Sequence, residues 1–186
     1  DESTGEYIEI FYPGPGVFLL CGCSFTDGDA VDVICEWELE PLADPDGIYG
    51  CCLPEGRYGI VMDPDYASGM QEYDLAESTL VFTVGNTTIG NGLTGNDPIT
   101  LYDIYGTAQA NVMSTYGTPL QYDDPLMCDD DGLDGIPFDP GEFHSVERKT
   151  PDLPDHEFSW MVSPEGGTPG GQADFQDTLD AAVDTV

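Results

Sequence analysis

The chain has 186 residues, and its 37 Asp and Glu against three Lys and Arg give a formal net charge of −34 at pH 7. Nucleic-acid binding needs basic side chains that neutralise phosphates, so this balance excludes a nucleic-acid partner. No apolar run approaches the roughly 18 residues of a membrane helix, which excludes membrane insertion. Such a charge attracts cations, and it predicts a halophilic protein or one that works in a calcium-containing exterior.

The composition is that of a folded domain. Hydrophobic residues make up 40% of the chain, with ten Tyr and eight Phe, which is enough for a core. The length fits one domain. The chain begins at Asp1 without a basic and apolar leader, which predicts a mature secreted protein at an extracellular or cell-surface location. A chain trimmed at this end would begin in the same way.

Cysteine content supports the extracellular location. The CxC and CC spacings are unlike those of zinc sites, and an even number of cysteines outside the cell favours disulfides. In the strand expected at 31–39, Cys35 shares a face with Trp37, which favours a buried bridge. Some unpaired or intermolecular cysteine remains the alternative. The expected disulfide cysteines are Cys21, Cys23, Cys35, Cys51, Cys52 and Cys128.

Hydrophobic periodicity is close to two, the period of a strand. At 31–39 the pattern places the odd-numbered residues, Trp37 among them, on a buried face and Asp32 on the opposite, solvent face. Clusters of Gly, Pro and Asp separate such segments, which is typical of an all-β sandwich or barrel. The expected strands are 6–12, 17–20, 31–39, 57–62, 78–84, 99–105, 108–116, 144–148 and 158–162.

Two segments depart from this pattern. Residues 123–139 carry seven Asp together with Gly and Pro, and they predict a long acidic loop. Residues 172–186 follow a Gly-rich stretch and have apolar residues near helical spacing, which predicts a short tail, either an amphipathic helix or an extended assembly arm.

The acidic loop is the main candidate metal site. Calcium prefers several carboxylate and carbonyl oxygens held by a tight turn. The expected ligands are Asp129, Asp131, Asp134 and Asp139. The spacing does not match an EF-hand, and a solvated acidic loop is the alternative. Weaker candidates are Asp44 with Asp46, and the cluster of Asp27, Asp29 and Asp32.

The other motifs give only weak indications of function. Asn86 begins the sequon Asn-Thr-Thr and is a candidate glycosylation site. No nucleophile elbow, phosphate loop or metalloprotease motif is present, so the sequence predicts a protein that is not an enzyme. His144 and His156 are expected in packing or surface roles. Several tyrosines favour either strand packing or a glycan-binding face: Tyr7, Tyr12, Tyr102, Tyr105, Tyr116 and Tyr122.

Several segments together resemble one family. EYIEIFYPG at 6–14 resembles the opening strand of lamin-tail-type domains, and VDVICEWELE at 31–40 resembles their tryptophan strand. HSVERKTPDLPDHEFSWMVSPEGGTPGG at 144–171 is similar to their closing segment. Further segments follow in the family's order at 53–65, 89–106 and 112–117. The cysteines and the loop at 123–139 are outside the family pattern.

The resemblance implies an all-β, immunoglobulin-like β-sandwich over residues 1–171, decorated by the 123–139 loop and followed by the 172–186 tail. Prokaryotic members are non-catalytic modules of secreted or surface proteins. Because the chain has no catalytic motif and such a fold has sheet edges available for strand addition, we expect an extracellular structural protein that binds copies of itself in a filament, sheath or surface layer, stabilised by calcium or other cations. The alternative is a secreted module that recognises a carbohydrate or a cell-surface protein.

Overall fold

The computed structural model describes residues 6–38, 49–64, 75, 79–94, 96–117, 128, 135–141, 144–163 and 169–170. In these residues the chain is almost entirely strands and turns, apart from two short 3-10 helices, η2 (Gln109–Asn111) and η3 (Glu157–Ser159). The expectation of an all-β fold is confirmed. The described part contains no helix of the length and apolarity needed to cross a membrane.

Each of the nine expected strands overlaps a strand of the structure. Two further strands, β3 and β5, were not expected from the pattern. The strands are β1 (Tyr7–Tyr12), β2 (Val17–Leu19), β3 (Ser24–Thr26), β4 (Val31–Glu36), β5 (Cys52–Pro54), β6 (Arg57–Met62), β7 (Leu80–Val84), β8 (Ile99–Tyr102), β9 (Val112–Tyr116), β10 (Val146–Arg148) and β11 (Trp160–Val162).

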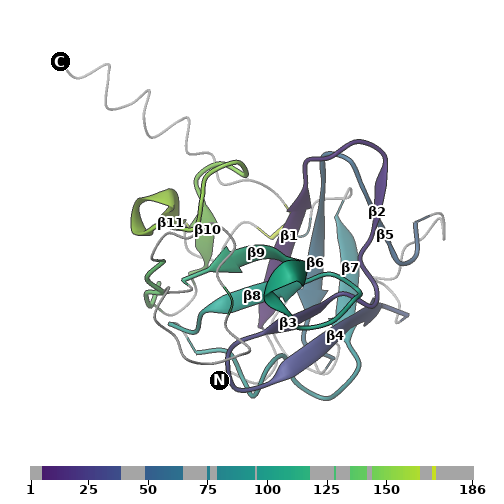
Figure 1. Ribbon diagram of the computed structural model, residues 1–186, viewed down its shortest axis with the longest axis horizontal. Helices are drawn as coiled ribbons and strands as arrows, with labels where there is room; N and C mark the ends of the chain where they lie inside the picture. The colour runs from purple at the N-terminus through teal and green to yellow at the C-terminus, as the bar shows by residue number, and fades with distance from the viewer. Residues whose placement is uncertain are drawn as a thin grey trace.

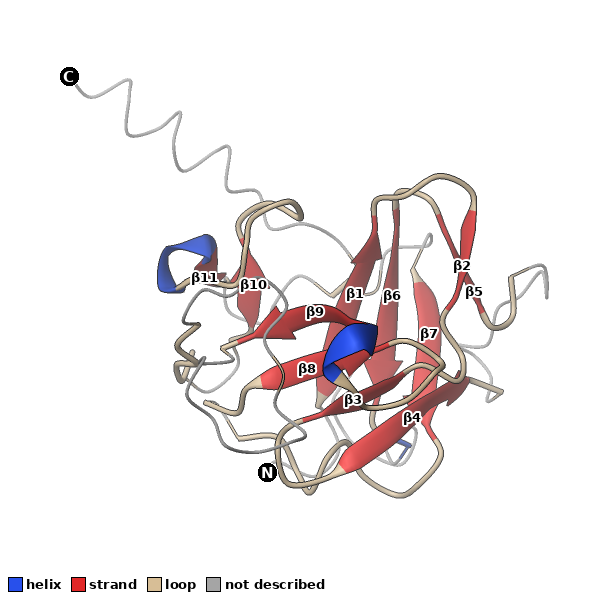
Figure 2. Ribbon diagram, viewed as in Figure 1, coloured by secondary structure: helices blue, strands red, loops and turns tan. Residues whose placement is uncertain are grey.

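Seven strands form one curled, mixed sheet in the order β1-β6-β7-β4-β3-β8-β9. Its pairs are antiparallel except β6 and β7, which are parallel. In Figure 2, β1, β6 and β7 run roughly across the direction of β3, β4, β8 and β9. The sheet changes direction where β4 meets β7. Its two edge strands are β1 and β9, which stand at the two ends of the strand order. Two ribbons, β2–β5 and β10–β11, lie outside this sheet (Figure 1).

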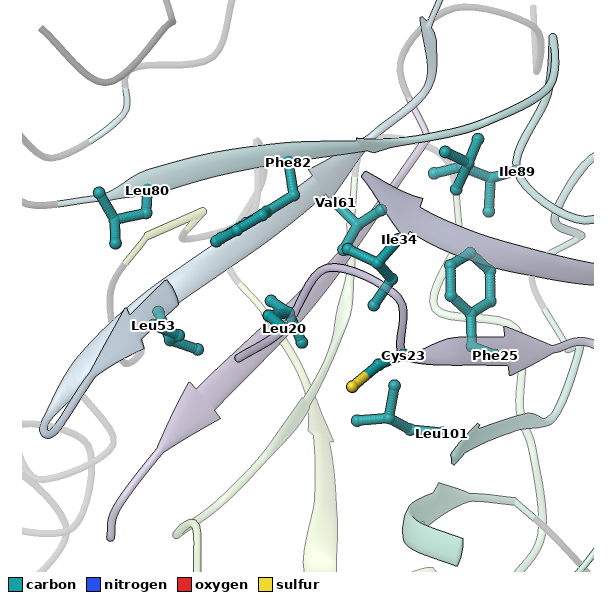
Figure 3. Packing of buried hydrophobic residues seen from close by; sticks show 11 residues of the cluster. Leu20, Cys23, Phe25, Ile34, Leu53, Val61, Leu80, Phe82, Ile89 and Leu101 are labelled. Atoms are coloured by element: carbon teal, nitrogen blue, oxygen red, sulfur yellow. The ribbon is translucent and has the colours of Figure 1, made fainter. Parts of the chain in front are cut away.

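The main core lies inside the curl. Phe25 of β3, Val61 of β6 and Phe82 of β7 are fully buried there, and Figure 3 shows them converging with residues from the connecting segments. Burial of each large apolar side chain contributes about 1.5–3 kcal/mol. Gly59 allows close packing, because a Cβ at this position would lie 2.9 Å from the Phe82 ring.

β4 presents the face opposite to the one that the sequence predicts. Asp32 and Ile34 are buried, with 2% and 1% of their surfaces exposed, whereas Val33 is 48% exposed. The expected solvent face of this strand is therefore wrong. The reason is local: Asp32 accepts hydrogen bonds from the 85–92 loop, which covers it. Trp37 is buried as expected, but it lies after β4 and packs with Ile60 and Met62 in a second cluster.

Candidate ligand-binding cavity

A cavity of about 580 Å³ lies where the two edge strands of the curled sheet approach β10. β1, β9 and β10 (Figure 1) each contribute residues to its wall, and Trp160 of β11 completes it. The volume is within the range of roughly 300–1,000 Å³ that suits small organic ligands. Most of the lining residues belong to strands, and the others lie in the connecting segments.

Aromatic side chains dominate the wall. The rings of Phe11 and Tyr58 lie 4.8 Å apart, and those of Tyr116 and Trp160 lie 4.7 Å apart in an edge-to-face contact. The register of the sheet explains the first pair, since Phe11 of β1 stands opposite Tyr58 of β6. All four rings line the cavity. Such rings offer both apolar contact and a negative face.

Arg148 lines this wall, and its guanidinium contacts other groups of the same chain. Its guanidinium lies over the Trp160 ring, 4.6 Å from the centroid, and its Nη2 donates to the Thr115 carbonyl at 2.8 Å. The neighbouring Lys149 donates from Nζ to the Phe158 carbonyl at 2.7 Å. The whole chain has only three Lys and Arg. Two of the three therefore hold the β10–β11 ribbon together and fasten it to β9.

Glu9 is a half-buried acid in the same wall. Its Oε2 accepts a hydrogen bond of 2.6 Å from the Gly170 amide. Burial raises the Glu9 pKa to about 8; the bond from Gly170 opposes this rise, and the nearby Glu147 adds to it. The pKa of Tyr58 is also raised, by burial and then by Glu9 and Glu147. Glu9 of β1, Tyr58 of β6 and Glu147 of β10 all line the cavity, and the charges of the two carboxyl groups influence the pKa of Tyr58.

The weaker calcium candidate is a structural cluster. Asp32 accepts from Asn86 Nδ2 at 2.6 Å and from the Gly90 amide, and its pKa is raised, chiefly by burial. Asp27 accepts from the amides of Ala30 and Asn91 at 2.8 and 3.2 Å. The oxygens of these carboxylates accept hydrogen bonds from the chain itself, and three of the donors belong to the 85–92 loop. The carboxylates therefore help to order this loop.

The main calcium candidate lies largely outside the described residues, as do Asp44 and Asp46. The three unplaced members are Asp129, Asp131 and Asp134. Asp139 is described; it is exposed, and its Oδ1 accepts from the Gly141 amide at 2.8 Å, as in an ordinary Asx turn. In the residues that the structure places, no group of three or more His, Cys, Asp or Glu is arranged to hold a metal ion. Calcium binding at 128–139 therefore stays a prediction.

The structure has one disulfide, between Cys21 and Cys51, instead of the three expected. Cys23 is fully buried, and burial raises the pKa of its thiol to about 11. Cys35 is half-buried, so the expected buried bridge at this position is wrong: β4 turns Cys35 away from the core together with Val33. The cysteines outside the disulfide are Cys23, Cys35, Cys52 and Cys128.

The glycosylation, histidine and tyrosine candidates differ in exposure and in their contacts. Asn86 is exposed, although its Nδ2 donates to Asp32. His144 Nδ1 lies 2.8 Å from the Ser163 carbonyl, and His156 accepts from the Phe158 amide. Tyr122 is outside the described residues. Of the other tyrosines, Tyr102 is buried, Tyr105 is 79% exposed, and those that line the cavity are Tyr7, Tyr12 and Tyr116.

Sequence reasoning missed the cavity and its acids. Glu9 appears in the sequence as the polar half of an alternating strand, and Glu147 lies in the segment expected as a strand at 144–148. One signal was available: Arg148 and Lys149 are adjacent in a chain with only three basic residues, which marks a position where a cation has a specific contact.

Compared with protein family models, with characterised proteins and with solved structures, the chain has no match.

Proposed function

We propose that this chain is a non-catalytic binding domain that holds a small organic ligand in the cavity between β1, β9 and β10. The observation that carries the proposal is the cavity itself, with its aromatic wall and its acidic groups. A concave, largely apolar site with a few polar groups is the usual form of a small-molecule site.

We also propose that the curled sheet is an immunoglobulin-like sandwich of the lamin-tail type, and that the protein works outside the cell. The order of the lamin-tail-like segments supports the first part. The Cys21–Cys51 disulfide supports the second, because disulfides persist in oxidising compartments. In such domains a binding role resides in the particular site and not in the fold.

Self-association, the function expected from the sequence, has less support. Addition of a strand from a second copy needs an open sheet edge. On β9 the Thr115 carbonyl already accepts from Arg148. A charged side chain at an edge strand is a common means of blocking strand addition. A filament or surface layer therefore remains a prediction that electron microscopy of the native material tests.

The experiment is a ligand screen with a blocked cavity. Ser114 of β9 lines the cavity and stands opposite Leu101, so Ser114→Trp places a large ring inside it. Val17→Trp is the matched control, because Val17 is 60% exposed and outside the cavity wall. Saturation-transfer NMR with neutral oligosaccharides and small organic molecules is the readout. We expect at least one ligand that S114W loses and V17W keeps. If the screen finds no ligand that behaves in this way, the proposal is overturned.

A further inference from the structure

The described wall of the cavity has more acidic than basic side chains. Glu9 and Glu147 both line it, and Glu147 adds to the rise in the pKa of Glu9. Glu6 and Asp97 are further acidic residues of the wall. Arg148 also lines it, and its guanidinium donates to the Thr115 carbonyl and lies over the Trp160 ring. Anionic ligands are disfavoured, and the question is whether the ligand is neutral or positively charged.

Aromatic rings accompany these carboxyl groups. Glu9 and Phe11 are two residues apart on β1, so they share a face, and Phe11 stands opposite Tyr58. The negative charges of Glu9 and Glu147 both add to the rise in the pKa of Tyr58 that burial causes. A carboxyl pair beside two ring faces is the arrangement that binds ammonium groups. The same wall already holds one cation in this way, at Trp160.

We propose that the ligand of this cavity is an organic cation, with its ammonium group held by Glu9 and Glu147 against the Phe11–Tyr58 ring pair. This inference rests on the proposed binding function and names its ligand class. The long-range field of the chain acts in the same direction, since a net charge of −34 concentrates cations near the surface. The cavity adds a shape and a ring contact that simple salt ions do not use.

Cation binding at this position is coupled to a proton. Among the described residues, the groups that act on Glu9 are Glu147 on β10 and the Gly170 amide; Tyr58 on β6 is influenced by Glu9 in turn, and Arg148 is next along β10. With a pKa of about 8, Glu9 is mostly protonated at pH 7 in the empty cavity. An ammonium group beside it favours the carboxylate, so the carboxyl O–H bond breaks and its proton passes to the buffer. Binding then becomes tighter as the pH rises from 6 to 9.

The test compares two probes of the same shape. Choline carries a quaternary ammonium group, and 3,3-dimethylbutan-1-ol is its neutral isostere, so their difference in affinity reports the charge alone. Affinities are measured by calorimetry on the full chain in high, constant potassium chloride. We expect choline to bind at least about tenfold tighter than the alcohol at pH 9, with the difference shrinking at pH 6. Equal affinities would overturn the inference.

Variants separate the site from the overall charge. Glu9→Gln and Glu147→Gln each remove one carboxylate from the wall, whereas Glu157→Gln removes one from the exposed η3 helix. We expect E9Q and E147Q each to lose about tenfold in choline affinity at pH 9 and E157Q to lose almost none. Calorimetry at pH 7 in two buffers of different ionisation enthalpy should show a proton released by the unmodified chain and none by E9Q. The same loss in all three variants would show attraction by net charge only and would overturn the inference.

The outcomes also distinguish this inference from the proposed function. If S114W abolishes binding of a neutral sugar or of the neutral alcohol, and choline does not bind, the cavity is a binding site and the cation inference is wrong. If S114W changes the binding of no ligand, both are wrong.

Discussion

The Oε2 atom of Glu9 accepts a 2.6 Å hydrogen bond from the amide of Gly170, which lies 161 residues further along the chain. The contact joins the first strand of the sheet to the last described residues. Gly170 has a φ of +85°, and a Cβ at this position would collide with the Thr79 side chain. The segment therefore passes β1 in a conformation that favours glycine, and this carboxyl group of the cavity wall is held in place.

Gly170→Ala should destabilise the fold through both the backbone and the contact with Thr79. Gly16→Ala is the control, because Gly16 has a similar φ of +81° but open space around it. We expect G16A to lose about 1–2 kcal/mol in the free energy of unfolding, the cost of a left-handed residue with a Cβ, and G170A to lose more. Denaturant unfolding measures both. Equal losses would mean that Gly170 has room for a side chain.

The stability of the fold should fall as the pH rises from about 4.5 to about 8. In this window the unfolded chain has released the proton of Glu9, with its ordinary pKa of 4.5, while the folded chain keeps it because burial raises the pKa to about 8. The folded state binds the extra proton, so the free energy of unfolding decreases by up to about 1.4 kcal/mol per pH unit. Above pH 8 this contribution is lost.

Glu9→Gln should remove this slope. Gln keeps an oxygen for the Gly170 amide and carries no charge, so E9Q should match the unmodified chain at pH 5 and exceed its stability at pH 9 by roughly 2–4 kcal/mol. Urea unfolding at fixed ionic strength is the measurement, with E157Q as the control for net charge. Parallel curves for E9Q and the unmodified chain would show that Glu9 titrates normally.

The strand pattern could be predicted from the sequence, but the faces and the cavity could not. Alternation located nine strands, including β2, β10 and β11, which have three residues each, but it missed the equally short β3 and β5. At β4, valines alternate with Asp32, and alternation alone assigns the aspartate to solvent. The structure buries Asp32 because the 85–92 loop supplies donors from more than 50 residues away. The cavity likewise depends on β1 and β9, the two edge strands of one sheet, lying beside the separate β10–β11 ribbon.

Asp32→Ala should be among the more destabilising substitutions of a charged residue in this protein. Asp32 is 2% exposed and accepts from Asn86 and Gly90, so its loss leaves the buried Gly90 amide without this acceptor. We expect a cost of roughly 2–4 kcal/mol. Glu157→Ala is the control, because Glu157 is exposed on η3 and its loss changes the net charge equally. Guanidinium unfolding compares the two; a cost for D32A no larger than that for E157A would show that the 85–92 loop does not depend on this carboxylate.

The cysteine arrangement predicts a specific alkylation pattern. Only Cys21 and Cys51 are joined, so unreduced protein unfolded in iodoacetamide should take up four alkyl groups, and peptide mapping should find them on the remaining cysteines. Three disulfides, as expected from the sequence, would leave none. The Cys21–Cys51 bond closes a separation of 30 residues, so Cys21→Ser with Cys51→Ser should cost roughly 3–4 kcal/mol in the free energy of unfolding. Cys35→Ser, at a half-buried thiol, is the control and should cost much less.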